Sequence, residues 1–279
     1  MGVFFLFLLA LAGGCLSTLF WIPEDDLGRG YFQTNALIVL GLLGLALTAY
    51  WLHPLAPFGD VGDVGDGGSL QLGPAGLYLA VAGGFGYYAG VWRLRWRAAR
   101  LAAAVALAGT GVALWVSAGA LVRTLTPLPH RELLLSAGLA SSALVLGWSL
   151  ITMLLGHWYL VAPRLSFRHL TVFCWVLLGA ILLRGLAVGG TLAVASGVDP
   201  LIEPHPLRLL TGFSGEGMFF WFRLLWGLAI PLGLGVMSLH CARNRSNQSA
   251  TGILYVLVVG CLIGEITAFY LTLATGVPV

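Results

Sequence analysis

The chain has 279 residues, of which 59% are hydrophobic and only 9% are charged, and its mean hydropathy is +0.94. This composition lies far outside the range of soluble globular domains. The net charge of +3 is small, and the basic residues, all Arg, are spread among the polar segments, which excludes a nucleic-acid-binding patch. The polar segments are too short to bury cores of their own, so residues 1–279 are expected to form a single integral-membrane domain in contact with lipid.

Apolar runs long enough to cross a bilayer recur along the whole chain, since a transmembrane helix needs about 20 such residues. The runs are continuous rather than alternating, which excludes the strands of a membrane barrel. The first run lacks the basic start and the cleavage site of a signal peptide, so we expect it to be retained. We therefore predict an all-α, polytopic bundle of about eight transmembrane helices, at residues 2–22, 35–56, 74–92, 101–122, 133–162, 170–196, 218–241 and 250–275.

The arginines predict how this bundle is oriented. Most of them fall in three loops on one side of an eight-helix topology: Arg93, Arg95, Arg97, Arg100, Arg164, Arg168, Arg243 and Arg245. Loops rich in arginine stay in the cytoplasm, so both termini are expected outside a multi-pass protein of the inner (cytoplasmic) membrane. One segment fits this rule poorly, because Glu24, Asp25 and Asp26 would be cytoplasmic beside the single Arg29.

Three ionisable residues lie well inside predicted spans, where a charge is costly and therefore a candidate for function: Arg184, Arg223 and Glu265. With a rise of about 1.5 Å per residue, all three fall in the outer half of the bilayer. They could form a buried ion pair that fixes helix register, which is the preferred interpretation. The alternatives are a site for a quinone headgroup, a proton or an anionic solute, with Glu265 as proton acceptor, or an Arg223 that reaches to the outer interface.

Two histidines were considered as axial ligands of haem b, because His157 and His240 lie at similar depth near the inner ends of their spans. Hydrogen-bonded histidines at the interface are the preferred interpretation. The four cysteines have no CxxC spacing, so no metal site is expected. The acidic repeat at residues 59–68 lacks the ligand spacing of a calcium loop and is expected to be a solvated outer loop. Pro231 should loosen the helical hydrogen bonds of its span.

Catalytic motifs are missing as well, since the chain contains no Walker A, GxSxG or HExxH sequence. We therefore do not expect an autonomous enzyme. At most, the chain is expected to be a subunit of an oxidoreductase that interacts with quinone.

The seventh span, Phe222-Arg223-Leu224-Leu225-Trp226-Gly227-Leu228-Ala229-Ile230-Pro231, together with the eight-span topology, resembles the NrfD/DmsC-type membrane anchors of respiratory oxidoreductases. This resemblance implies a helical subunit without a cofactor of its own that docks a periplasmic redox partner and binds a quinone. The first hypothesis is thus an integral membrane subunit of a respiratory or other electron-transfer complex. The alternatives are a small-solute or ion transporter, with the three buried charges along its path, and a structural or assembly subunit without a site.

Overall fold

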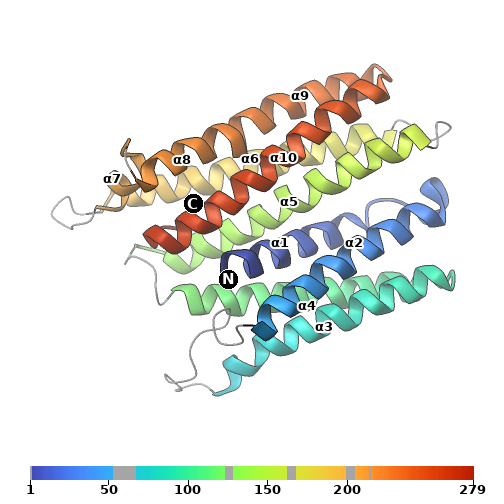
Figure 1. The fold of residues 1–279 in the computed structure, drawn as a ribbon, viewed down its shortest axis with the longest axis horizontal. Helices are drawn as coiled ribbons and strands as arrows, with labels where there is room; N and C mark the ends of the chain where they lie inside the picture. Colours follow the sequence, from blue (N-terminus) through green and yellow to red (C-terminus); the bar gives the residue numbers. More distant parts are fainter. Residues whose placement is uncertain (1, 53–66, 123–127, 162–167, 199–204, 214) are drawn as a thin grey trace.

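The structure is a computed structural model that describes residues 2–52, 67–122, 128–161, 168–198, 205–213 and 215–279. All regular structure in these residues is helical (Figure 1). The elements are α1 (Gly2–Thr18), α2 (Glu24–Leu52), α3 (Gly67–Trp92), α4 (Trp96–Val122), α5 (Arg131–Val161), α6 (Arg168–Ser196), α7 (Pro206–Thr211), α8 (Glu216–Leu224), η1 (Leu225–Ala229), α9 (Ile230–Arg243) and α10 (Asn247–Thr275). The predicted all-α class is confirmed.

Six helical segments of the described chain are long and apolar enough to cross a bilayer: α2, α4, α5, α6, the continuous helix from α8 through η1 to α9, and α10. The chain is therefore a multi-pass membrane protein. Two of the eight predicted crossings do not reach this criterion. Helix α1 is apolar but only 17 residues long, because the predicted run 2–22 ends early at Thr18, ahead of Pro23. Helix α3 contains many glycine and tyrosine residues, which dilute its apolar content.

Helix α1 lies between two groups of helices (Figure 1). It packs most extensively against α5, and it also contacts α2, α4 and α10. The contact with α5 is close because Gly14 and Gly147 face each other, and a Cβ atom on either would collide with the backbone of the other helix. Glycine is needed at this crossing because small residues let membrane helices approach closely. The short α1 is thereby held at the centre of the bundle, with most of its residues buried.

A π-helical turn, η1, interrupts the seventh predicted span directly before Pro231. Its hydrogen bonds are one residue longer than those of an α-helix, as the N–H of Ile230 donates to the carbonyl of Leu225. Proline has no N–H and crowds the preceding turn, so the predicted loosening at Pro231 is present in this form. Within η1, Gly227 packs against Gly264 of α10, where an added Cβ would lie 2.7 Å from the Cα of Gly264. This close crossing brings the end of α8 onto the middle of α10.

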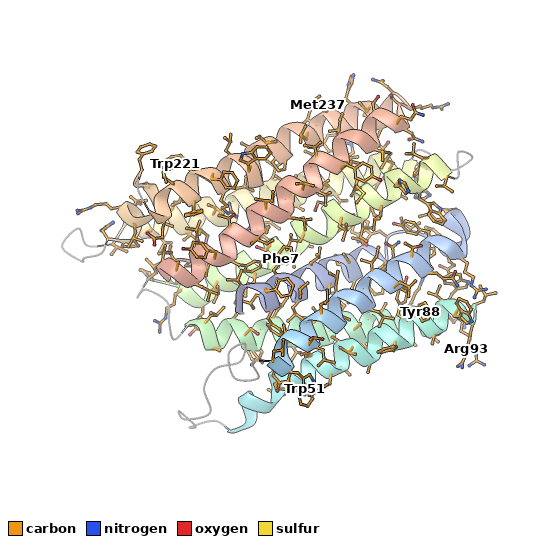
Figure 2. All side chains as sticks on the ribbon, in the orientation of Figure 1. Phe7, Trp51, Tyr88, Arg93, Trp221 and Met237 are labelled. Carbon is orange, nitrogen blue, oxygen red and sulfur yellow. The ribbon has the colours of Figure 1, made fainter. Side chains whose placement is uncertain are left out.

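One end of the bundle carries the arginines of the α3–α4 and α9–α10 connections, and we refer to it as the arginine-rich end; Figure 2 shows Arg93 there, with Trp51 and Trp221 toward the opposite end. The acidic segment that fits the orientation rule poorly is paired at this end. Glu24 forms a salt bridge with Arg100, and Oδ2 of Asp26 lies 2.9 Å from Nε2 of His169. The acidic repeat up to residue 66, and also Asp199, Glu203 and Arg164, lie outside the described residues.

Candidate functional site

The three ionisable residues singled out in the sequence lie together in the structure. Arg184 comes from the middle of α6, Arg223 from the last turn of α8, and Glu265 from α10. Their exposed fractions are 2%, 0% and 0%, respectively. We call these three residues the charged cluster. Its geometry follows from the packing of α10 against both α8 and η1, and of α6 against α9.

Arg184 and Glu265 form the well-bonded half of the charged cluster. The Nε of Arg184 donates to Oε1 and Oε2 of Glu265 at 3.0 and 3.1 Å, and Nη2 lies 3.0 Å from Oε2. Ser142 of α5 adds a further bond, donating its hydroxyl to Oε2 at 2.5 Å. Charge-assisted bonds of this kind offset the desolvation of both groups. The carboxylate is thus held from two neighbouring helices.

Arg223 is bonded far less well, although it is the largest of the fully buried side chains. Its only contact with Glu265 is a 3.5 Å approach of Nη2 to Oε1. Within the described residues, none of its three nitrogens makes a hydrogen bond. A guanidinium has five N–H donors, and burying such donors without acceptors costs stability. The charged cluster therefore holds two cations for one carboxylate, and Arg223 is the cation in excess.

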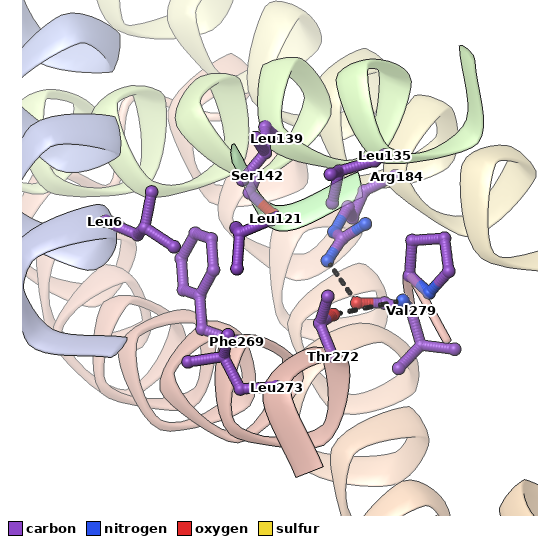
Figure 3. Close-up of a pocket in the computed structure, with 12 residues that line it drawn as sticks. Leu6, Leu121, Leu135, Leu139, Ser142, Arg184, Phe269, Thr272, Leu273 and Val279 are labelled. Atoms are coloured by element: carbon purple, nitrogen blue, oxygen red, sulfur yellow. Dashed lines mark hydrogen bonds between the residues drawn. The ribbon is translucent and has the colours of Figure 1, made fainter. Parts of the chain in front are cut away.

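Arg184 also lines a small cavity, whose walls are drawn in Figure 3. Its walls include Gly138, Leu139 and Ser142 of α5. The cavity volume of about 10 Å³ is close to that of one water molecule. Its lining is apolar apart from Arg184, Ser142 and Thr272, so a polar group that enters it meets one cation and two hydroxyl groups.

The last residues of the sequence close this cavity. Gly276 has a φ of 69°, which ends α10 and turns the chain back into the bundle. Val277 and Val279 are consequently buried, at 0% and 3% exposed. The Nη2 of Arg184 donates to the main-chain oxygen of Val279 at 2.9 Å, as the dashed line in Figure 3 shows. Arg184 thus binds a main-chain oxygen and the carboxylate of Glu265 at the same time.

The two histidines considered for haem have different partners. The Nδ1 of His157 lies 3.0 Å from the hydroxyl of Tyr255, and the Nε2 of His240 lies 3.0 Å from the side-chain nitrogen of Asn244. Both side chains are on the exposed surface. Helix α9, which carries His240, packs against α6 and α10. Helix α5, which carries His157, packs on the other face of these two helices. Among the described residues, no group of three or more His, Cys, Asp or Glu side chains could hold a metal ion.

Two members of the site were not singled out in the sequence. Ser142 has a weak signal, because it is one of two adjacent serines inside an apolar run, but serine also occurs in such runs as a small packing residue. Val279 has no signal at all, because its role comes from its main-chain oxygen. Sequence reasoning identified the charges of this site and missed the neutral groups that complete it.

Comparison with known proteins adds no relative. No protein-family model matches this chain, and no curated protein matches it. The resemblance to NrfD/DmsC-type anchors therefore stays a prediction, and the function is argued from the site itself.

Proposed function

We propose that this chain is an integral membrane subunit of a respiratory or other electron-transfer complex, and that it binds a quinone at Arg184 beside Glu265. One observation carries the proposal: Arg184 donates to a main-chain oxygen that lines the cavity while it is paired with a buried carboxylate. In this proposal the chain is a single domain that crosses the cytoplasmic membrane eight times, has both termini outside, and anchors redox partner subunits.

The chemistry of a quinone fits these groups. A quinone carbonyl accepts hydrogen bonds, and its reduction to the quinol takes up two electrons and two protons. In the proposed site Arg184 donates a hydrogen bond to one carbonyl, and Ser142 donates to the carboxylate of Glu265. The two protons come from water and pass through Glu265 to the two ring oxygens in turn, and the two electrons come from the redox partner subunits.

A ring does not fit into a cavity of about 10 Å³, so the headgroup must replace the segment 277–279. The main-chain oxygen of Val279 stands where the quinone carbonyl would bind. The segment is attached by few polar contacts, the longest being the 3.4 Å bond from the N–H of Val279 to the Thr272 hydroxyl. Exchange of the Val279 oxygen for a quinone carbonyl oxygen leaves the hydrogen bond of Arg184 satisfied.

A structural role is the main alternative, and one observation favours it: Arg184 and Glu265 already satisfy each other. A register-fixing ion pair needs only one arginine, however, and Arg223 adds a buried cation with a single loose contact. An uncompensated buried charge lowers stability, so its presence argues for a role other than register. The small cavity gives the transporter alternative no specific support.

The binding test uses a quinone without a side chain and the variant Gly138→Leu. Gly138 lines the cavity, and its added Cβ would lie 3.7 Å from Nη1 of Arg184, so a leucine there fills the headgroup position. We expect binding, measured by quenching of tryptophan fluorescence in nanodiscs, to weaken about tenfold or more, which corresponds to about 1.4 kcal/mol. Gly189→Leu on α6 is the matched control, since nothing lies within 4 Å of its Cβ and the glycine is exposed.

The partnership is tested by purifying the protein from its native membrane in mild detergent. We expect mass spectrometry to identify at least one copurifying redox subunit, and organic extraction to release quinone. A pure chain that carries neither would contradict the proposal. If Gly138→Leu lowers the yield of folded protein but the wild-type protein binds no quinone, the structural alternative is correct.

A further inference from the structure

A second, larger hollow lies beside the proposed quinone site, between α1, α4 and α5. Its volume is about 260 Å³, and its walls include Gly14 of α1, Gly111 and Trp115 of α4, and Leu139 and Ala140 of α5. We call it the apolar groove. Gly111, Trp115 and Ala140 are on the exposed surface, so the groove opens toward the surrounding lipid.

Two of the three hydroxyl groups that line the apolar groove, those of Ser17 and Thr110, form hydrogen bonds within their own helices. Ser17 donates to the carbonyl of Gly14 at 2.6 Å, and Thr110 donates to the carbonyl of Ala106 at 2.7 Å. A water molecule needs two to four polar partners to stay in such a place, and these groups offer few. The surface of the groove therefore suits a hydrocarbon and not a polar solute.

The apolar groove and the cavity at Arg184 share a wall. Leu139 lines both of them. On α5, Gly138 and Ser142 face the cavity, while Ala140 and Ala143, each one or two positions further along, face the groove. Successive residues of a helix point in directions about 100° apart, so these are adjacent faces of one helix.

The apolar groove also has the direction that a tethered chain requires. Along α5 it extends from Ser136 to Leu144, nine residues that span about 12 Å, at the same level as the cavity. On α4, which begins at the arginine-rich end, the groove is lined by residues 107–118 and the cavity by Leu121. The groove therefore begins at the level of the cavity and continues along α4 toward the arginine-rich end. A chain attached to a ring in the cavity would enter the groove past Leu139.

We propose that the apolar groove binds the hydrocarbon chain of the quinone, so that the ligand is a prenyl- or alkyl-substituted quinone with its ring at Arg184. This inference rests on the proposed function. Because lipid is as apolar as the groove, transfer of the hydrocarbon chain from the bilayer contributes little hydrophobic free energy. Its binding comes instead from packing contacts with three helices, which also fix the orientation of the quinone ring. A phospholipid chain would fit the same groove but would have no connection to the cavity.

The experiment compares two quinones, one without a side chain and one with a decyl chain, in the same nanodiscs. Gly111→Leu fills the apolar groove from α4 without a collision, because nothing lies within 4 Å of its Cβ. Gly119→Leu is the matched control, since that glycine is equally open and exposed on the same helix but does not line the groove. Each quinone is compared between variants, so its partition into the lipid cancels.

We expect Gly111→Leu to weaken binding of the decyl quinone about tenfold and to leave the quinone without a chain unchanged. Ala140→Leu, which enters the groove from α5, should give the same pattern, and Gly119→Leu should change neither affinity. Equal effects on both quinones, or no effect on either, would overturn the inference about the groove and leave the headgroup site standing. If the wild-type protein does not bind the quinone without a chain, the proposed function itself is wrong.

Discussion

Arg223, the cation in excess in the charged cluster, is the most unusual of its three residues. Its guanidinium is fully buried, and its one ionic contact is 3.5 Å long. Glu265, in contrast, is the only side-chain carboxylate that contacts either arginine of the charged cluster among the described residues. Replacing Glu265 should therefore lower the free energy of unfolding more than replacing Arg223. In a balanced ion pair the two replacements would have similar effects.

We expect Glu265→Gln to lower the free energy of unfolding by about 3–5 kcal/mol, because it leaves two buried arginines without a counter-charge. Arg223→Met should cost much less, since it removes a cation that makes no hydrogen bond. In the double variant the methionine should recover part of the loss caused by the glutamine, because only one cation then remains. The measurement is thermal unfolding in detergent, and an Arg223→Met variant as unstable as Glu265→Gln would contradict this view.

The sequence could identify the members of the charged cluster, because any charge inside an apolar run is conspicuous. It could not tell which arginine would be paired. The sequence left open whether Arg223 reaches the outer interface, and in the structure only Arg184 lies at the right height and rotation on its helix to make a close pair with Glu265. The histidine pair illustrates the same limit, since similar depth did not give His157 and His240 a common partner.

At the level of elements, the crossing of η1 over α10 determines where Arg223 and Glu265 meet. At this crossing Gly227, four residues after Arg223, touches Gly264, one residue before Glu265. The sequence predicted a disturbance at Pro231 but not that it would take the form of a π turn. It also did not predict this glycine contact, because both glycines lie in runs that contain several others.

We expect Gly227→Ala to destabilise the protein by about 1–3 kcal/mol, as overpacking of a close contact does. The added methyl group would push η1 away from α10 and separate Arg223 from Glu265. Gly233→Ala on α9 is the control, because its added Cβ meets nothing within 4 Å. Thermal unfolding and quinone affinity should both fall for Gly227→Ala and stay unchanged for Gly233→Ala. Equal behaviour of the two variants would show that the crossing does not position the charged cluster.

For the whole molecule, the notable feature is that the end of the sequence returns to a site built by α5, α6 and α10. If the segment 277–279 competes with the quinone for Arg184, its removal should strengthen binding. We expect deletion of residues 277–279 to increase the affinity for the quinone without a chain about tenfold. The deletion should also lower thermal stability, because it exposes the place that Val277 and Val279 fill.

Thr272→Val is a milder form of the same change, since it keeps the buried valines and removes one hydroxyl, which accepts from the N–H of Val279 and donates to the carbonyl of Ala268 within α10. It should raise the affinity for the quinone less than the deletion does, without a comparable loss of stability. An affinity that falls in both variants would mean that the segment supports the site rather than competes for it.

The sequence alone determined that this protein is an all-helical, multi-pass membrane protein and where its costly charges lie. Both follow from the bilayer, which offers backbone groups no hydrogen-bond partner except within a helix and makes every enclosed charge conspicuous. Only the tertiary structure decided that Arg184 and not Arg223 is the bonded arginine, that Val279 supplies a main-chain oxygen, and that Glu24 and Asp26 find partners at the arginine-rich end. In these helices the buried and the lipid-facing sides are both apolar, so the sequence does not specify how each helix is rotated, and that rotation determines which side chains meet.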